Sequence, residues 1–293
     1  MKVLVTGRTG QVATSLAEAA AQWPDIGLVA VGRPQFDLAD SATILGSITE
    51  VRPDVVVSAA AYTAVDKAED EPELVYAINA QGPAAVAAAA RALGVPIIHL
   101  STDYVFSGDG GEPYTETCAT GPRTVYGQSK LAGEKAVARA NPRHIILRTS
   151  WVYSPFGTNF VKTMLALAPT RDRVSVVCDQ WGNPTSALDV ARAILTIARQ
   201  AREAPPGIYH YAGAGETNWA GFARHVFDAS KANGGPFAEV IDIASTDYPA
   251  KARRPRNSRL SCAKAQTTFK LTTADWRAST ETVVRRLLTA QAG

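Results

Sequence analysis

The chain has 293 residues, of which 46% are hydrophobic and 19% are charged, so it can bury a large core and is not a disordered chain. Its formal charge of +3, from 30 basic and 27 acidic residues, is too small to indicate a nucleic-acid or membrane partner. Cys118, Cys178 and Cys262 lack the spacing of metal ligands, which favours a reducing compartment and argues against a zinc site.

The N-terminal segment "MKVLVTG" passes from one lysine directly into a short β-type run and predicts no secretion signal. The longest apolar tract, in "GPAAVAAAARALG", is interrupted by Arg91 and is too short to span a membrane. We therefore expect a soluble, cytoplasmic protein.

Short β-branched runs alternate with helical patterns through the first half of the chain. Five runs are apolar on consecutive residues, and these are "KVLVTG", "GLVAVG", "DVVVSAA", "PIIHLST" and "HIILRTS". Such runs are typical of strands that helices cover on both faces. Helical patterns occur in "QVATSLAEAAAQW" and in "SALDVARAILTIARQA", which starts at Ser186. The alternation predicts an α/β fold with a doubly wound parallel sheet of the Rossmann type.

After about residue 150 the alternation weakens, and proline, glycine, asparagine and aromatic residues become frequent. We expect residues 1–152 to form a dinucleotide-binding Rossmann domain, to which segments near 186–212 return. Residues 153–293 would form mainly a smaller C-terminal substrate-binding lobe. This lobe would close a cleft at the carboxyl ends of the sheet strands.

The first predicted strand ends in "TGRTGQVA", where Gly7 and Gly10 lie between a strand and a helix. Glycines at this position permit a tight turn and bring backbone N–H groups close to a pyrophosphate at a helix N-terminus. The same residues also fit an ordinary strand-to-helix turn. The motif alone therefore leaves both interpretations open.

The residue that follows the second predicted strand bears on the choice of cofactor. NAD-specific enzymes commonly carry an acidic residue there for the ribose 2′-hydroxyl, whereas this chain has Gly32 and Arg33. A guanidinium suits a 2′-phosphate, and Arg8 in the glycine turn could assist. We expect NADPH as the cofactor, with NADH possible, unless Arg33 is a solvated loop residue.

A candidate proton-transfer pair lies in "YGQSKLAGEK". Tyr126 and Lys130 are four residues apart on one face of a predicted helix, a spacing that chance can also supply. Thr102 follows an apolar run and so lies at the carboxyl end of a strand. In a ketone reduction the tyrosine would donate the proton, the lysine would lower the pKa of the tyrosine, and the threonine would orient the carbonyl. The structural alternative is a solvated helix start and a strand-end cap.

These motifs together resemble those of the extended short-chain dehydrogenases/reductases, with a finer match to the dTDP-4-dehydrorhamnose reductases. The segments that carry the resemblance lie within residues 7–260 and are "GRTGQVA", "RPDVVVSAAAYTAVDKAEDEP", "STDYVFSGDG", "VYGQSKLAGEKA", "RTSWVY", "NFVKTML", "DQWGNPT" and "RPRNSRL". The resemblance implies NADPH-dependent reduction of the C4 keto group of dTDP-4-dehydro-β-L-rhamnose to dTDP-L-rhamnose. That product is a precursor of cell-surface polysaccharides.

The resemblance also implies roles for individual residues. It places Gly10, Gln11 and Val12 at the pyrophosphate, Asp37 and Leu38 at the adenine, Ala61, Tyr62 and Thr63 along the cofactor, and Thr102, Asp103 and Trp151 at the sugar nucleotide. Asn79 is expected to be structural or to hold a water, and Ser58 replaces an asparagine that is typical of the family. Some relatives bind a divalent ion through acidic residues at a dimer interface, but only Glu18 lies nearby here. We expect no metal, and either a monomer or a homodimer.

Later segments offer further substrate contacts. "KARRPRNSR" packs five basic residues into nine positions and could be a solvated loop, a nucleic-acid contact or a diphosphate clamp. Arg254 is the first choice for the clamp because the family places an Arg-Pro element there. Trp151 could stack on a sugar ring or belong to the core, and Asn183 offers a hydrogen-bonding amide.

Related reactions on the same scaffold provide the alternatives. Nucleotide-sugar 4,6-dehydratases typically have Thr-Asp-Glu where this chain has Thr102, Asp103 and Tyr104, so reduction is favoured over dehydration. An epimerase with tightly held NAD is disfavoured by Arg33. A reductase or epimerase for a different nucleotide deoxysugar remains open, as does a non-catalytic NADP-binding regulatory subunit of another enzyme. The intact Thr102, Tyr126 and Lys130 set counts against the regulatory subunit.

Overall fold

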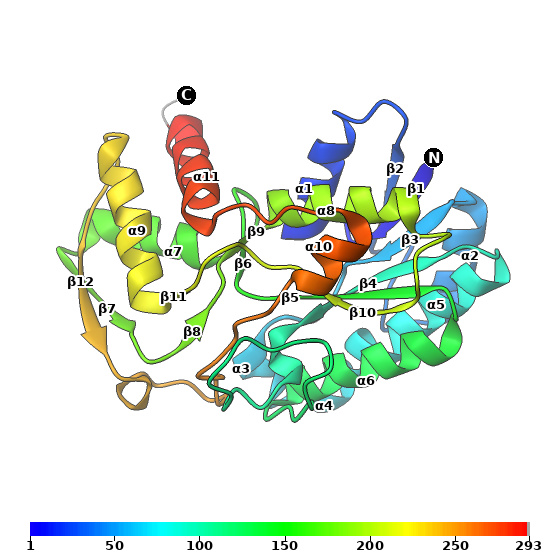
Figure 1. The fold of residues 1–293 in the computed structure, drawn as a ribbon, viewed down its shortest axis with the longest axis horizontal. Coiled ribbons are helices and arrows are strands. Elements are labelled where there is room, and N and C mark those ends of the chain that lie inside the picture. Colours follow the sequence, from blue (N-terminus) through cyan, green and yellow to red (C-terminus); the bar gives the residue numbers. More distant parts are fainter. Residues whose placement is uncertain (292–293) are drawn as a thin grey trace.

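The computed structural model describes residues 1–291, which form two lobes (Figure 1). The larger lobe contains a six-stranded parallel sheet of order β10-β5-β4-β3-β1-β2. Its strands are β1 (Lys2–Thr6), β2 (Gly27–Val31), β3 (Val55–Ser58), β4 (Ile97–Thr102), β5 (His144–Thr149) and β10 (Gly207–His210). The predicted doubly wound sheet is confirmed. All five predicted runs form strands, and the sixth strand comes from a segment that follows the smaller lobe's first elements.

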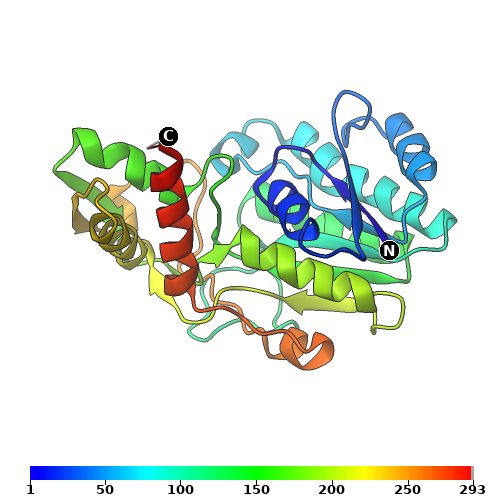
Figure 2. The same cartoon turned by 90° about the horizontal axis from the view of Figure 1, so that it is seen from above.

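Helices cover both faces of the sheet (Figures 1 and 2). One face carries α1 (Gln11–Ala20), α8 (Ala187–Gln200) and α10 (Ala263–Phe269), and the other carries α2 (Ala42–Val51), α5 (Gly82–Ala92) and α6 (Val125–Ala140). Within β1, Val3 and Val5 pack with the residues of α1, α8 and α10, whereas Leu4 packs on the other face with those of α2, α5 and α6. Alternate side chains point to opposite faces of a strand, so a sheet covered on both sides requires consecutive apolar residues.

The smaller lobe lies beside the carboxyl ends of the sheet strands. Its helices are α7 (Phe160–Leu167), α9 (Trp219–Ala232) and α11 (Trp276–Gln291), and β7 (Arg173–Val177) pairs in parallel with β12 (Glu239–Ile243). Two pairs of short strands follow. Strand β6 (Val152–Tyr153) pairs in parallel with β9 (Thr185–Ser186), and β8 (Trp181–Gly182) pairs antiparallel with β11 (Thr217–Asn218). The short helices are α3 (Val65–Ala68), α4 (Pro72–Tyr76), η1 (Ala77–Gln81), η2 (Asp103–Val105), η3 (Ala168–Thr170) and η4 (Ser245–Asp247).

Within residues 1–291, none of the helices has the length and apolar character that a membrane crossing demands.

Helix α6 approaches its neighbours closely through two glycines. Its start is capped by Thr124, whose hydroxyl oxygen accepts a hydrogen bond of 3.0 Å from the N–H of Gly127. A Cβ added at Gly127 would overlap the carbonyl oxygen of Tyr104, and one added at Gly133 would overlap that of Asn79. The helix can therefore lie directly against η1 and η2, with its polar face close to the end of β4.

Replacing Gly133 with alanine should destabilise the protein, because the backbone at Asn79 has no room for a methyl group. We expect a loss of about 1 to 3 kcal/mol in the free energy of unfolding, the usual effect of overpacking. Urea unfolding followed by circular dichroism measures this change.

The matched control is Gly46→Ala in α2, where an added Cβ meets no atom within 4 Å. There the substitution should stabilise the helix by about 0.5 to 1 kcal/mol through its better helix propensity. Equal effects of the two substitutions would contradict the close approach of α6 to η1.

Candidate active site

The strand order reverses at β1, which has β2 on one side and β3 on the other. In open α/β sheets ligands bind at such a switch point, beyond the carboxyl ends of the strands. The Thr6 hydroxyl oxygen accepts hydrogen bonds from the N–H groups of Ala59 at 3.0 Å and Ala60 at 3.1 Å. The N–H of Gly7 donates to the carbonyl of Val31 at 2.7 Å. The ends of three strands are thus joined around the glycine turn.

The glycine turn has the properties of an anion site. Gly7 has a φ of +98°, which a residue with a side chain rarely adopts. Gly10 is the N-cap of α1, no side chain of the described residues caps that end, and a Cβ at Gly10 would meet nothing within 4 Å. The first turn of α1 also carries no acidic residue. Its open N-terminus, with its positive dipole end, fits a pyrophosphate.

Gln11, the first residue of α1, joins the two lobes. Its Oε1 accepts hydrogen bonds from the Ser154 hydroxyl at 2.9 Å and from the Asn159 amide at 3.0 Å. Its Nε2 lies 3.4 Å from the carbonyl oxygen of Val152. Val12 follows and packs against the core between α1 and α8. The side-chain amide of Gln11 therefore connects the glycine turn to the smaller lobe.

Arg8 follows β1 and Arg33 follows β2, and both side chains are exposed. A Cβ at Gly32 would lie 3.2 Å from Cγ of Arg8, which brings the two turns into contact. The Nη1 atom of Arg8 is 3.5 Å from Oε1 of Gln35. Two exposed arginines thus follow the carboxyl ends of the paired strands β1 and β2.

Asp37 and Leu38 continue from this turn toward α5. The Asp37 carboxylate accepts a hydrogen bond of 2.9 Å from the N–H of Ala39, which shapes the loop. Leu38 is buried, and its backbone lies so close to Gly82 that a Cβ there would be 2.5 Å from the Leu38 carbonyl oxygen.

A buried amide connects the segment after β3 to α6. Asn79 accepts a hydrogen bond of 2.8 Å from the N–H of Tyr62, and its Nδ2 donates to the Tyr62 carbonyl at 3.1 Å and the Ser129 hydroxyl at 3.0 Å. The Ser129 hydroxyl in turn donates to the carbonyl of Tyr126 at 2.7 Å. Ala61, Tyr62 and Thr63 are therefore held at a defined distance from the helix that bears Tyr126.

The structure brings Thr102, Tyr126 and Lys130 together at the end of β4. The Thr102 hydroxyl donates to Oδ1 of Asp103 at 3.1 Å and accepts from the N–H of Tyr104 at 3.2 Å. The rings of Tyr104 and Tyr126 meet edge to face, with centroids 5.5 Å apart. The Lys130 ammonium is buried and donates to the carbonyl oxygen of Leu100 at 2.6 Å.

Burial dominates the proton affinities of this group. It raises the pKa of Tyr126 above its ordinary value, and hydrogen bonding with Thr102 opposes that rise. It lowers the pKa of Lys130 to about 8, against the attraction of Glu134. Tyr126 consequently keeps its proton at neutral pH, as a proton donor must, while Lys130 still carries most of its charge.

Asp103 presents a buried polar atom toward the same region. Burial raises the pKa of its carboxyl to about 6, with hydrogen bonds from Ser258 and Thr102 opposing the rise. Its Oδ2 has no hydrogen-bond partner among residues 1–291. A buried oxygen without a partner carries a free-energy cost that a ligand hydroxyl would remove.

The predicted substrate residues occupy different environments. Trp151 has a φ of 48° and stacks on Trp219, with ring centroids 3.6 Å apart, so one face of its indole is covered. The amide of Asn183 donates to the Gly215 carbonyl at 2.6 Å and its oxygen accepts from the N–H of Leu260 at 2.9 Å. Asn183 therefore connects three loops of the substrate side.

Arg254 is paired with Asp66 at 2.7 Å, which holds the basic segment against α3. A narrow crevice lies between this segment and η2, lined by Tyr104, Phe106, Ser107, Arg123, Thr124, Arg253 and Pro255. The crevice is adjacent to Tyr126 because Thr124 and Tyr104 both contact its helix.

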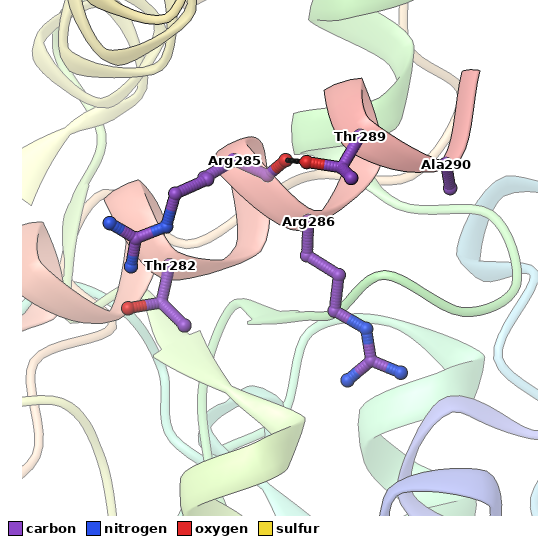
Figure 3. A pocket seen from close by; sticks show the side chains of 5 residues that line it. All are labelled: Thr282, Arg285, Arg286, Thr289 and Ala290. Atoms are coloured by element: carbon purple, nitrogen blue, oxygen red, sulfur yellow. Dashed lines mark hydrogen bonds between the residues drawn. The ribbon is translucent and has the colours of Figure 1, made fainter. Parts of the chain in front are cut away.

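A second hollow lies on the surface of α11, lined by Thr282, Arg285, Arg286, Thr289 and Ala290 (Figure 3). Arg286 there pairs with Glu18 of α1 at 2.6 Å. The acidic residue considered for a metal is thus engaged by a guanidinium that joins α1 to the substrate lobe. In the described part of the chain, no group of three His, Cys, Asp or Glu side chains could hold a metal ion.

Sequence reasoning missed a buried ion pair between Glu134 and Arg148, which lies behind Lys130. One signal was available: Glu134 follows Lys130 by four residues and Tyr126 by eight, which places all three on one face of a helix. The partner Arg148 carries no such signal, because it lies 14 residues from Glu134 in a different element.

The parallel sheet, the glycine turn and the tyrosine-lysine helix define an extended short-chain dehydrogenase/reductase. The family model described as "RmlD substrate binding domain" matches residues 1–289, and the chain belongs to this family.

Known proteins resemble this chain along its whole length. It is 51% identical over 292 residues to a dTDP-4-dehydrorhamnose reductase from Sinorhizobium fredii, and the match covers 98% of each chain. A crystal structure of a dTDP-4-dehydrorhamnose reductase from Clostridium acetobutylicum superposes with a TM-score of 0.92 at 35% identity, covering 98% of this chain and 100% of the other. A Bacillus anthracis dTDP-4-dehydrorhamnose reductase in complex with NADP has a TM-score of 0.90 at 33% identity, covering 96% and 98%.

Proposed function

We propose that this protein reduces the C4 keto group of dTDP-4-dehydro-β-L-rhamnose to give dTDP-L-rhamnose, with NADPH as the hydride source. The observation that carries the proposal is the cluster of Thr102, Tyr126 and Lys130 at the end of β4. It occurs in a chain that is 51% identical, end to end, to a protein named for this reaction.

The residues around the glycine turn fit a nicotinamide dinucleotide. The open N-terminus of α1, with Gly7, Gly10 and Gln11, would hold the pyrophosphate. Asp37 and Leu38 would border the adenine, and residues 61–63 the nicotinamide side. The exposed Arg33 and Arg8 favour a 2′-phosphate and hence NADPH.

Bound NADPH would supply a hydride to C4 of the sugar. Tyr126 donates its phenolic proton to the C4 oxygen as that oxygen becomes an alkoxide, so one hydride and one proton convert the ketone to an alcohol. The Thr102 hydroxyl, which donates to Asp103 in the structure, would turn to donate a hydrogen bond to the same oxygen and stabilise its developing charge. The Lys130 ammonium stabilises the phenolate that remains and can bind the nicotinamide ribose.

The remaining predicted residues would hold the sugar nucleotide. The unpartnered Oδ2 of Asp103 would accept from a sugar hydroxyl, and the indole of Trp151 would contact the sugar ring. Arg254 would share its guanidinium between Asp66 and the diphosphate, since a guanidinium has five N–H donors. Asn183 would act by fixing the loops around the nucleotide.

Replacing Tyr126 with phenylalanine removes the proton donor and should lower kcat about 10²- to 10⁴-fold, the usual contribution of general acid catalysis. NADPH oxidation with dTDP-4-dehydrorhamnose measures the rate, and NADPH fluorescence measures cofactor affinity, which should change little. Tyr209→Phe, in β10, is the control and should keep wild-type turnover. Near wild-type turnover by the Tyr126 variant would contradict the role of Tyr126 as the proton donor.

Failure of the wild-type protein to reduce this sugar, while it copurifies with another enzyme, would support the alternative of a non-catalytic regulatory subunit.

Replacing Arg33 with alanine should raise the KM for NADPH about 10-fold or more and leave the KM for NADH nearly unchanged, because a charge-assisted contact to phosphate is lost. Arg91→Ala is the control, since this exposed residue lies in the last turn of α5, shortly before the amino end of β4 and away from the carboxyl ends of the strands. Steady-state kinetics with each cofactor measures these KM values. Equal kcat/KM with NADH and NADPH in the wild type would refute the preference for NADPH.

The pKa of about 8 for Lys130 predicts a pH dependence. The lysine is charged below that pH and neutral above it, so kcat for reduction should fall as the pH rises through about 8. A kcat profile between pH 6 and pH 10, at saturating substrates, tests the prediction. A rate that stays constant to pH 10 would show that the Lys130 charge is not required.

A further inference from the structure

A buried ion pair lies behind the proposed catalytic residues, and the proposed mechanism does not use it. Glu134 of α6 and Arg148 of β5 are 2% and 1% exposed. The guanidinium donates to both carboxylate oxygens, from Nε at 2.8 Å and from Nη2 at 2.7 Å. The Ser101 hydroxyl donates to the same carboxylate at 2.6 Å. One carboxylate therefore receives three hydrogen bonds from two neighbouring strands.

The ion pair is connected to each member of the catalytic set. Ser101 directly precedes Thr102, and Ser101 is the register partner of Arg148. Glu134 lies one helical turn beyond Lys130 and two beyond Tyr126. The carboxylate thus joins the strand end that positions Thr102 to the helix that positions the other two residues.

Stability alone is a weak reason for such a group to be buried. Removing two charges from water is costly, and apolar residues of similar volume often serve equally well. Arg148 even leaves its Nη1 without a hydrogen-bond partner among the described residues, with the guanidinium placed over the Phe106 ring, 4.9 Å from its centroid. A charge at this position is better explained by what it does to its neighbours.

Lys130 is the neighbour most sensitive to that charge. The elements packed around Lys130 carry several titratable or charged groups. They are Tyr126, Glu134, Lys135 and Arg139 on its own helix, His99 on β4, His144 and Arg148 on β5, Asp103 and Tyr104 on η2, Asp66 and Lys67 on α3, Glu73 and Tyr76 on α4, and Arg91 on α5. Burial and the charge of Lys130 hold the pKa of His99 well below its usual range, so His99 is neutral. Burial lowers the pKa of Lys130, and Glu134 is the charge that opposes this fall.

We propose that Glu134 is a positioning residue for proton transfer: held by Arg148 and Ser101, its carboxylate keeps Lys130 charged and fixes Thr102 against Tyr126. This inference rests on the proposed reductase function. It assigns a role to the last residue of the "YGQSKLAGE" motif, which sequence reasoning left without one.

The test compares the pH dependence of kcat in the wild type, Glu134→Gln and Glu134→Asp. Without the carboxylate charge the pKa of Lys130 falls. The fall of kcat at high pH, which is the alkaline limb of the profile, should therefore move to lower pH by about one unit or more in Glu134→Gln. Glu134→Asp keeps the charge, and its limb should stay close to that of the wild type even if kcat falls. A residue that only supports the fold would change the melting temperature and leave the limb in place.

A paired variant guards against misfolding of Glu134→Gln, whose Arg148 would be buried without its counter-ion. Glu134→Gln with Arg148→Gln removes both charges, and its limb should also move to lower pH, but by less than in the single variant, because the lost guanidinium had opposed the charge of Lys130. Asn141→Ala is the control for helix destabilisation, because this buried residue ties the end of α6 to the Val95 carbonyl at 3.0 Å. Its melting temperature should fall while its pH profile stays in place.

The outcomes separate the two proposals. A wild-type protein that does not reduce the keto sugar overturns the proposed function. A wild-type protein that turns over, together with an unshifted limb in the folded glutamine variant or the paired variant, overturns the role of Glu134.

Discussion

The contact between α6 and β4 is the constraint on which the rest of this site depends. The Lys130 ammonium reaches the Leu100 carbonyl at 2.6 Å, a short, charge-assisted hydrogen bond in a buried setting. The helix can come this close because Gly127 and Gly133 leave space for the backbones of η2 and η1. Any side chain at these positions would move Tyr126 away from the end of the strand.

A second set of contacts places the cofactor side against the same helix. Asn79 forms hydrogen bonds with the backbone of Tyr62 and the hydroxyl of Ser129. The chain beyond β3 is therefore held in place by α6 as well as by the sheet. Thr6 and Gly7 connect the ends of β1, β2 and β3 in a similar way. The segment after β3 and the helix that bears Tyr126 are thereby held by one continuous polar framework.

Among the polar contacts that join the smaller lobe to this framework, two involve side chains of α1. Gln11 receives hydrogen bonds from Ser154 and Asn159, and Arg286 pairs with Glu18. Helix α1, which begins at the glycine turn, therefore carries two of these connections.

The sequence by itself determined the layers of the fold and which side chains come together at the end of β4. Consecutive apolar residues specify strands buried on both faces, so Val3, Leu4 and Val5 predict a covered parallel sheet without reference to any neighbour. The spacing of Tyr126 and Lys130 likewise follows from helix periodicity. Only the tertiary structure decided where each charge is directed: Lys130 toward a strand carbonyl, Arg254 toward Asp66, and Arg148 toward Glu134. These choices depend on burial and on partners distant in sequence, because the free energy of a charge is set by the dielectric and the counter-ions around it, and local sequence contains neither.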